Sequence, residues 1–451
     1  MISKFKIPNR GLLVLLFLNL ISCSKEVRLD NVSNGSLNNN SLQVVVTFNT
    51  DLETEAFVEY WLAGSNEKST SDIYTGTINH EIVLIGLTGE SEYIYRIHLK
   101  NKELESTSNE YSFITGELPI HLPEFNLVVN KENAFDGFLM LRKMDDPGAQ
   151  IIINSKGKIV WYQLSDSVIF RPFSITDNST YLALKAKDEI VEMNFYGDTT
   201  LHLFHNENGF DKKLHHEIFK DENNNIVALT KEEKVFDLLE FGGTSEVPVA
   251  GDGILILDTL GNKVWHWNMF DVMDIGPSER MYQTRGDWSH ANALSKDNDG
   301  NFLISFRNFN QIWKIDATDG HIIWKLGDDG NIELDDRDHF RVQHNVHINP
   351  NGSMMIFDNI NIVDKRRSSR ALAFKIDEIK KSAEKVLEVR LPDSLYSFKQ
   401  GSVSLIDKDK LLFCSSMSKK LAITDLSGNI IWQVNSNQSF YRAEYIPKFQ
   451  N

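Results

Sequence analysis

The chain has 451 residues, of which 41% are hydrophobic, and a formal net charge of −16 at neutral pH. A chain of this length can bury a large core and divide into two domains. Its acidity argues against nucleic acid as a partner, because nucleic acids select basic surfaces, and it requires any anion site to be locally cationic.

The N-terminus has the pattern of a lipoprotein signal peptide. Basic residues precede an apolar run over residues 11–21, which is too short to span a bilayer, where about 20 apolar residues are needed. The run ends in Leu-Ile-Ser-Cys, so we expect residues 1–22 to be removed and Cys23 to carry lipid. An uncleaved anchor is the alternative. The prediction places the protein in the cell envelope, lipid-anchored in the periplasm or on the outer-membrane surface.

Cysteine usage is sparse. Only Cys23 and Cys414 are present, so acylation of Cys23 would leave no partner for an intramolecular disulfide. We therefore expect the fold to be held by its core alone.

The next segments predict a tether and a first domain. Residues 23–40 are polar and rich in Asn, which is typical of a flexible tether. Short β-branched and aromatic runs follow, for example at 42–48 and 93–99, and turn residues separate them. This pattern predicts a β-sandwich over residues 41–118.

One motif refines the type of sandwich. Leu87 and Thr88 precede Tyr93 in a pattern that resembles the tyrosine corner of fibronectin-like and immunoglobulin-like domains. In that corner a Tyr hydroxyl bonds to nearby backbone. We expect Tyr93 to make this bond.

Residues 119–451 contain a loose internal repeat. Each unit has a strand, a turn with Asp or Asn and Gly, and a strand that ends in Trp or another large residue. Strong copies end at Trp161, Trp265, Trp324 and Trp432, and weaker copies lie around residues 194–198 and 374–377. Six units predict an all-β, six-bladed β-propeller rather than two stacked sandwiches. We expect glycine in the turns and tryptophan packed between blades.

Three histidines occupy the same position relative to a strand in three different units. His216, His290 and His344 each lie roughly ten residues before a hydrophobic strand, and Arg307 ends the second of these strands. Equivalent positions of a propeller converge on the central channel, so the sequence predicts one anion-binding site there. His215 could replace His216 if the local register differs. Asn292 could orient a ring nitrogen or form a turn.

Several short motifs in this order resemble the bacterial arylsulfate sulfotransferases, a family of periplasmic six-bladed propellers with an N-terminal β-sandwich. The similarity covers nearly the whole mature chain. The motifs are His215-His216-Glu217, Asp287-Trp288-Ser289-His290-Ala291-Asn292, Ser305-Phe306-Arg307, Gln343-His344, Phe357-Asp358-Asn359, Ser369-Arg370-Ala371 and Gln400-Gly401-Ser402-Val403.

The resemblance implies a function and a set of site residues. The family moves a sulfuryl group from a phenolic sulfate ester to a phenol through a sulfohistidine, without a nucleotide sulfate donor and without a cofactor. Carried over by position, the nucleophile matches His344 and the assisting residues match His216, His290 and Arg307. Asn292 and Arg370 match substrate-binding positions, although the basic cluster around Arg370 could equally be a solvated loop. Enteric members carry a disulfide that an acylated Cys23 would rule out here.

Elementary chemistry is consistent with that role. Imidazole, with an ordinary pKa of about 6.5, is largely neutral and nucleophilic near pH 7 to 8, and an Arg can hold sulfonate oxygens bidentately. The chain has no phosphate-binding glycine loop, Cys-Xaa-Xaa-Cys or His-Glu-Xaa-Xaa-His motif, so ATP, haem and protease zinc are not expected.

Two other functions stay open at this stage. The first is a metal-dependent lyase or hydrolase with His216, His290 and His344 as ligands. The second is a noncatalytic surface lipoprotein that captures a partner. The oligomeric state also stays open, with a homodimer as one option.

Overall fold

The computed structural model describes residues 27–37, 40–102, 104–143, 145–164, 170–176, 180–185, 189–273, 276–360 and 367–448. The predicted signal peptide, residues 1–22, and Cys23 lie outside this part of the chain. Within it, no helix has the length and apolar character needed to cross a membrane.

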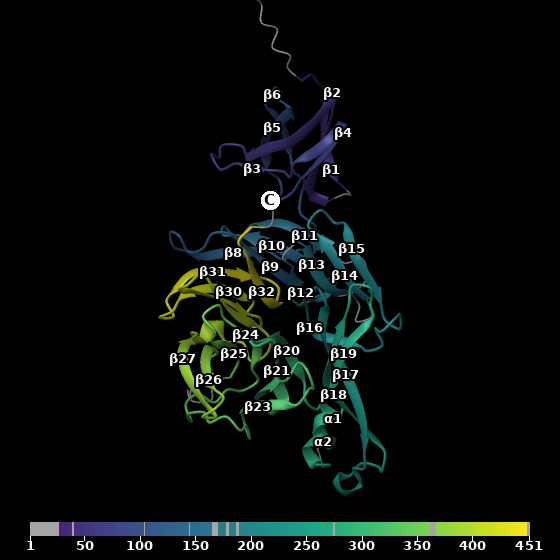
Figure 1. The fold of residues 1–451 in the computed structure, drawn as a ribbon. Coiled ribbons are helices and arrows are strands. Elements are labelled where there is room, and N and C mark those ends of the chain that lie inside the picture. Colours follow the sequence, from purple (N-terminus) through teal and green to yellow (C-terminus); the bar gives the residue numbers. More distant parts are fainter. Residues whose placement is uncertain are drawn as a thin grey trace, which may run out of the picture.

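The N-terminal domain is built around one long bent strand (Figure 1). β2 (Asn40–Leu62) pairs with β1 and β4 through its first half and with β3 and β5 through its second half. Side chains from both halves share one core with β4 and β5. The other strands are β1 (Leu29–Leu37), β3 (Ser69–Thr70), β4 (Tyr74–Leu84), β5 (Glu92–Asn101), β6 (Leu104–Thr107) and β7 (Tyr111–Ile114).

The predicted tether is wrong over half of its length. Residues 29–37 form β1, which is antiparallel to β2. Leu29 and Val32 pack against the domain core, while most other side chains of the strand are exposed. An edge strand with so few apolar contacts has the composition of a linker, which is why the sequence pattern misled.

The tyrosine corner is present as predicted. The hydroxyl of Tyr93 accepts a hydrogen bond from the backbone N–H of Thr88 at 2.9 Å. This bond fixes the turn before β5 to the strand that follows it.

The rest of the chain forms six antiparallel sheets, which confirms the six-bladed propeller. The innermost strand of each blade lies near the innermost strand of the next, around the centre seen in Figure 1. The first, second and third blades contain β9 (Phe138–Lys143), β10 (Ala149–Asn154), β11 (Ile159–Leu164); β12 (Phe170–Ile175), β13 (Thr180–Lys185), β14 (Glu189–Asn194), β15 (Thr199–Phe204); β16 (Leu214–Lys220), β17 (Ile226–Phe236), β18 (Val247–Leu257), β19 (Lys263–Asn268).

The fourth, fifth and sixth blades repeat this order. They contain β20 (Ala291–Lys296), β21 (Phe302–Phe306), β22 (Gln311–Ile315), β23 (Ile322–Gly327); β24 (His344–Ile348), β25 (Met354–Asp358), β26 (Arg370–Asp377), β27 (Ser382–Arg390); β28 (Ser402–Ile406), β29 (Lys410–Ser415), β30 (Lys420–Asp425), β31 (Ile430–Ser436).

Both ends of this region close the ring. β32 (Phe440–Ile446) is the inner strand of the first blade and pairs with β9. β8 (Phe125–Asn130) adds a fifth strand to the sixth blade by pairing with β31. The last strand of the chain therefore borders the central channel.

Tryptophans join neighbouring blades, as the sequence predicts. The indole N–H groups of Trp161 and Trp432 donate to the backbone oxygens of Phe195 and Ser155, each in a turn of the next blade. In the third blade, the predicted Trp265 is partly buried and stacks on Phe302 of the fourth blade, with ring centroids 5.5 Å apart. Trp267, two residues later, donates to the oxygen of Gly320 in the same neighbouring blade.

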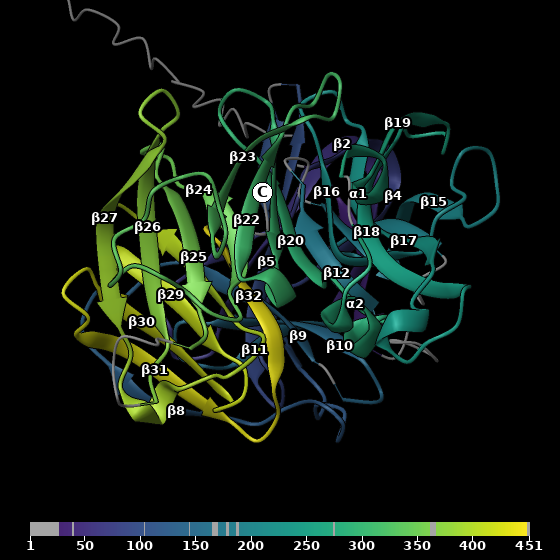
Figure 2. The ribbon, with the colours of Figure 1, turned by 90° about the horizontal axis from the view of Figure 1, so that it is seen from below.

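The third blade carries an extension. β17 and β18 pair over eleven residues each and run past the sheet. The short helices η1 (Leu239–Phe241), α1 (Met269–Val272) and α2 (Glu279–Thr284) lie close to β18 (Figure 2). Two further short helices lie in connections. η2 (Arg307–Phe309) joins β21 to β22 within the fourth blade, and η3 (Asp393–Leu395) lies between β27 of the fifth blade and β28 of the sixth.

Candidate active site

The three predicted histidines meet at the start of the inner strands. His216 lies in β16, His290 immediately precedes β20, and His344 begins β24. The ring centroids of His216 and His290 are 5.2 Å apart. Tyr441 in β32 lies between the histidines, with its ring 6.0 Å from that of His216 and 6.3 Å from that of His344. Three blades and the closing strand thus contribute to one cluster.

Irregular backbone aims these side chains. The pairing of each inner strand with its neighbour shifts register at the histidine, as expected for a β-bulge. His216 and His290 adopt left-handed φ values of 55° and 51°, and Asn345, next to His344, has 59°. Bulges re-aim side chains beside active sites, and a non-glycine residue in this region costs about 1 to 2 kcal/mol. The local conformation is held by the blades around it.

His344 is a neutral imidazole with a defined tautomer. Its Nδ1 lies 2.9 Å from the carbonyl oxygen of Val342 and 2.7 Å from Oδ1 of Asn359. Both partners are acceptors, so Nδ1 carries the hydrogen and Nε2 keeps a lone pair. Burial lowers the pKa of His344 to about 3, and the charge of Arg307 acts in the same direction. That lone pair accepts a 3.2 Å hydrogen bond from the backbone N–H of Gln400.

The amide of Asn359 can point only one way. Its Nδ2 donates to the backbone oxygens of Ser397 and Gln400 at 2.7 and 2.6 Å. The side-chain oxygen therefore faces His344. Asn359 thus holds the hydrogen of the His344 ring on Nδ1 and leaves Nε2 with its lone pair.

His215 and His216 face different surroundings, which decides between them. His215 is buried, and its Nε2 lies 3.1 Å from the carbonyl oxygen of Thr230. His216 is the residue that contacts His290 and Tyr441. Burial, followed by the neighbouring imidazoles, lowers the pKa of His216 well below its ordinary value. The structure places His216, not His215, at the cluster.

His290 is paired with a carboxylate that the sequence analysis did not assign. Its Nδ1 makes a short hydrogen bond to Oδ2 of Asp287, and Nζ of Lys231 lies 3.0 Å from the other oxygen. Burial alone would raise the pKa of Asp287, but the bond to His290 and the charge of Lys231 hold it below its usual range. Asp287 is therefore ionised and fixes the hydrogen of His290 on Nδ1.

Arg307 supplies positive charge to the same cluster. It starts η2, and its backbone N–H donates to the carbonyl oxygen of His290 at 3.0 Å. Its Nη1 donates to Oδ1 of Asn308 at 3.0 Å. Burial lowers the pKa of this guanidinium, while Asp287 and Tyr441 oppose that shift. A partly desolvated guanidinium beside neutral imidazoles suits an anionic ligand.

The two predicted substrate-binding residues are both buried. Arg370 is 0% exposed, and its guanidinium is engaged by Asp358, Glu388 and two backbone oxygens, so this side chain is not accessible to a substrate. Asn292 donates to the carbonyl oxygen of Gln343 at 2.7 Å, while its Oδ1 has no hydrogen-bond partner among the described residues. Both side chains support the segments that carry Asn359 and His344, and the substrate-binding role of Asn292 stays a prediction.

Tyr441 is a site residue that sequence reasoning missed. The sequence showed only a strand at this position. Tyr441 could have been found by noting that the last strand of a propeller can close the ring as the inner strand of the first blade. Its hydroxyl is buried and has no hydrogen-bond partner among the described residues. Burial raises its pKa to about 12, so the hydroxyl keeps its hydrogen. Arg142 lies over its ring at 5.6 Å.

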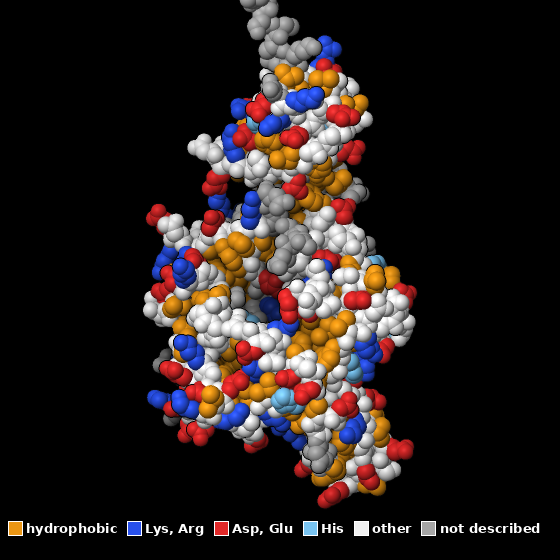
Figure 3. Space-filling model, viewed as in Figure 1, with side chains coloured by type: hydrophobic (Ala, Val, Ile, Leu, Met, Phe, Trp, Pro, Cys, Tyr) orange, Lys and Arg blue, Asp and Glu red, His pale blue; other side chains and the backbone are white. Residues whose placement is uncertain are grey.

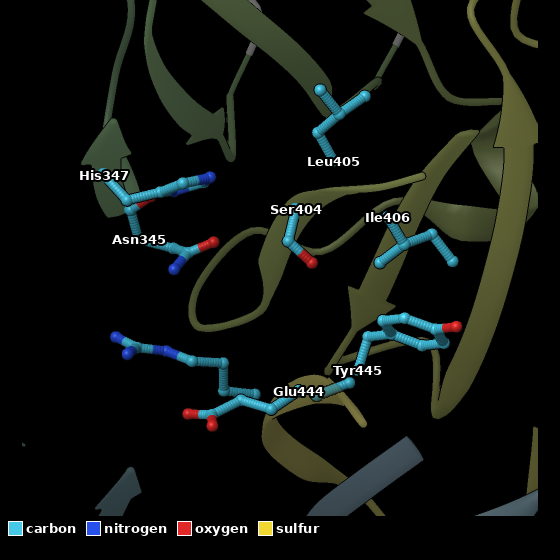
Figure 4. A pocket seen from close by; sticks show the side chains of 9 residues that line it. Asn345, His347, Ser404, Leu405, Ile406, Glu444 and Tyr445 are labelled. Carbon is cyan, nitrogen blue, oxygen red and sulfur yellow. The ribbon is translucent and has the colours of Figure 1, made fainter. Parts of the chain in front are cut away.

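The central channel is hollow beyond the histidines. A space-filling view shows a depression in the middle of the propeller with charged side chains inside (Figure 3). A cavity of about 290 Å³ lies along β24, β28 and β32, and its lining includes Asn345, His347, Ser404, Arg442 and Glu444 (Figure 4). Arg442 makes a bidentate pair with Glu217 at 2.8 Å. Burial raises the pKa of Glu444 to about 7.

The three histidines do not form a metal site by geometry. In the described part of the chain, the one group of three or more potential ligands whose atoms all lie within 4.8 Å is Asp316, Asp319 and His321, on the surface. His216, His290 and His344 do not meet that spacing. The zinc-type arrangement considered from the sequence therefore has no support from these positions.

Fold and site together define a six-bladed propeller with a histidine and arginine cluster in its channel. The sequence profile of the arylsulfotransferase (ASST) family matches residues 123–440. The chain belongs to this family, and a sulfotransferase function on phenolic substrates is what membership supports.

Other comparisons add little. No curated protein matches the chain. A protein of unknown function from Bacteroides caccae is 11% identical, with a TM-score of 0.47, over 70% of this chain and 100% of its own. A virginiamycin B lyase from Staphylococcus aureus is 12% identical, with a TM-score of 0.37, over 68% and 88%. A Bacteroides thetaiotaomicron protein of unknown function is 12% identical, with a TM-score of 0.38, over 92% and 99%. Likeness at this level carries no argument about function.

Proposed function

We propose that the protein transfers a sulfuryl group from a phenolic sulfate ester to a phenolic acceptor by a ping-pong mechanism, with His344 as the covalent carrier. The observation that carries the proposal is the state of His344. It is buried, neutral and protonated on Nδ1, which leaves the Nε2 lone pair as the nucleophile. The reaction uses no nucleotide sulfate donor and no cofactor.

In the first half-reaction, Nε2 of His344 forms a bond to sulfur as the bond from sulfur to the aryl oxygen breaks. The contact from the Gln400 N–H is given up as sulfur approaches. By analogy with phosphoryl transfer, charge builds on the leaving aryloxide and on the equatorial oxygens. Arg307 stabilises that charge, and an imidazole at His216 or His290 that took up a proton in the preceding turnover gives this proton to the aryloxide.

The second half-reaction reverses these steps with a new phenol. The imidazole takes the phenolic proton, the phenolate oxygen attacks sulfur, and the bond from Nε2 of His344 to sulfur breaks. The enzyme returns to its starting protonation state. Atoms and charges balance without any external group.

The test is a coupled donor and acceptor assay. Pure protein with 4-nitrophenyl sulfate should release nitrophenolate in a stoichiometric burst, and sustained release should require added phenol. His344→Asn should reduce the rate by at least about 10³-fold, the scale seen when a covalent nucleophile is removed. The exposed His121→Asn serves as a matched control and should retain wild-type activity.

Trapped protein should show the added mass of one sulfuryl group on the peptide that contains His344. Sustained release without acceptor, or an adduct on another residue, would contradict the mechanism. Sulfotransfer that survives His344→Asn would do so as well.

We also propose that Cys23 is acylated and that the mature protein is held at the cell envelope. The sequence of the first 23 residues supports this. Mass spectrometry of protein purified from membranes should find a lipid-modified Cys23 as the first residue. An intact unmodified Met1 would refute it.

The solution mass of a variant without Cys23 decides between a monomer and a homodimer.

A further inference from the structure

His215 and Asp252 are buried next to His216, and the proposed reaction does not use them. His215 contacts Thr230 and Asp252 through Nε2, which is 3.1 Å from the backbone oxygen of Thr230 and 3.1 Å from Oδ1 of Asp252. Its other nitrogen, Nδ1, is 2.8 Å from Nδ1 of His216. The two rings are nearly perpendicular, at 86°. The bulge between His215 and Ile218 lets these consecutive side chains meet.

The hydrogens of this chain of contacts can be assigned. Both neighbours of Nε2 in His215 are oxygen acceptors, so a neutral His215 ring carries its hydrogen on that nitrogen and has a lone pair on Nδ1. A contact of 2.8 Å between two ring nitrogens needs one hydrogen, which in this arrangement comes from Nδ1 of His216. Nε2 of His216 is left with its lone pair directed away from His215.

Asp252 couples this arrangement to the rest of the site. It is 1% exposed. Its Oδ2 accepts hydrogen bonds from the hydroxyl of Ser289 and the backbone N–H of Ala291, the two neighbours of His290. Nζ of Lys231 lies 3.8 Å from Oδ1. Asp252 thus holds the segments of both His216 and His290 with one carboxylate.

We propose that His215 and Asp252 are positioning residues that fix the hydrogen of His216 on Nδ1 and so present its Nε2 lone pair to the acceptor phenol. The kinetic part of this inference rests on the proposed sulfotransfer. When Nε2 of His216 takes the phenolic proton, the O–H bond breaks and an N–H bond forms. The resulting imidazolium donates to His215, and the carboxylate of Asp252 offsets its charge.

The direct test is nitrogen-15 NMR of the full-length protein with labelled histidine. Chemical shifts of ring nitrogens distinguish the two neutral tautomers, and loss of one signal set in His216→Gln assigns His216 among the 13 histidines. We expect the Nδ1–H form for His216 and the Nε2–H form for His215. The reverse pair of tautomers in the wild-type protein would overturn the proposal without any variant.

Two substitutions at His215 supply the matched comparison. His215→Asn keeps an acceptor oxygen near the original Nδ1, whereas His215→Leu removes it. We expect His215→Leu to lose the Nδ1–H tautomer of His216 and to slow the acceptor half-reaction by about 10² or more, the scale of general base catalysis. His215→Asn should keep the tautomer and remain within about tenfold of wild type, since the base itself is intact. Equal losses in both variants, with the tautomer unchanged, would mean that His215 only supports packing.

Failure of the inference and failure of the proposed function give different results. The NMR measurement needs no substrate, so expected tautomers in a protein inactive toward aryl sulfates would support the positioning pair and refute sulfotransfer. An active sulfotransferase with the reverse tautomer at His216 would do the opposite. The nitrophenolate burst from 4-nitrophenyl sulfate provides an internal check, because this good leaving group needs little acid assistance and the burst should survive His215→Leu.

Discussion

The outer turns of the blades and the starts of their inner strands both contain residues with a left-handed backbone, but they use different residue types there. The outer turns place Gly157, Gly261 and Gly428 at left-handed φ values. In each, an Asn or Asp three residues earlier accepts two backbone N–H groups. At the starts of the inner strands the left-handed positions include His216, His290 and Asn345. Glycine serves in the three outer turns, where only the backbone shape is needed, whereas His216 and His290 combine that shape with a side chain in the site.

The largest effect that would sharpen this comparison is expected at Arg307, the guanidinium that the proposed mechanism assigns to the anionic substrate. Arg307→Ala should lower kcat/KM for 4-nitrophenyl sulfate by about 10² to 10³, the usual cost of removing one preorganised donor. Arg307→Lys should give an intermediate loss because it keeps the charge but not the planar fork. The measurement is initial-rate kinetics on folded protein.

A matched control is the exposed Arg337, which pairs with Asp335 on the surface. Arg337→Ala should leave kcat/KM unchanged. A loss below tenfold for Arg307→Ala would show that the guanidinium does not stabilise the transition state.

Acid should weaken the inner site before it affects the outer turns. The pKa of His344 is about 3 in the folded protein and about 6.5 when unfolded, so the unfolded chain binds the extra proton between these values. The stability that His344 contributes is complete above pH 6.5 and falls as the pH drops toward 3. The free energy of unfolding can change by at most about 1.4 kcal/mol per pH unit for this one group.

The measurement is urea unfolding of wild type and His344→Asn at pH 6.5 and pH 5. Wild type should lose up to about 2 kcal/mol more than the variant over this interval. Glu444, with a pKa raised to about 7, acts in the opposite direction, but its contribution cancels in the comparison. Parallel pH dependence in the two proteins would mean that His344 titrates normally.

The outer turns should show the converse behaviour, with an effect on stability alone. Gly428 has a φ of 85°, and a methyl group there would meet only ordinary contacts. Gly428→Ala should therefore cost about 1 kcal/mol from backbone strain and leave kcat/KM unchanged. Gly35→Ala is the control, because that glycine has no left-handed φ and open space around it. A change in kcat/KM for Gly428→Ala would show that the turns and the site are coupled.

The same contrast explains what the sequence could predict. Regular hairpins with Gly and Trp recur in the chain, so blade number and the positions of His216, His290 and His344 follow from spacing. Asp252 escaped notice because it lies inside β18, far in sequence from the histidines that it holds. Arg370 was misassigned because a motif match carries no information on burial.

Tyr441 was missed because of the way the ring closes. Its position in the channel depends on β32 returning to the first blade, a long-range pairing that no local pattern encodes. The additional contact of Trp267 with the Gly320 oxygen was missed as well. Trp267 lies two residues after Trp265, the position that the repeat aligns with Trp161 and Trp432.

The smallest predicted effect separates a substrate contact from packing at the two tyrosines of β32. Tyr441 has a buried hydroxyl without a hydrogen-bond partner in the described structure, whereas the Tyr445 hydroxyl donates to the backbone oxygen of Asp136. Tyr441→Phe should leave stability unchanged or higher, because it removes an unsatisfied polar group, and should lower kcat/KM by up to about tenfold through loss of one hydrogen bond to substrate.

Tyr445→Phe should give the opposite signature, a loss of about 1 kcal/mol in stability with kcat/KM unchanged. Urea unfolding and initial rates on both variants distinguish the two cases. If Tyr441→Phe were fully active, its hydroxyl would have no partner in the catalytic cycle either. The ring would then serve only as a wall between His216 and His344, and the inner strand of the first blade would contribute shape without chemistry.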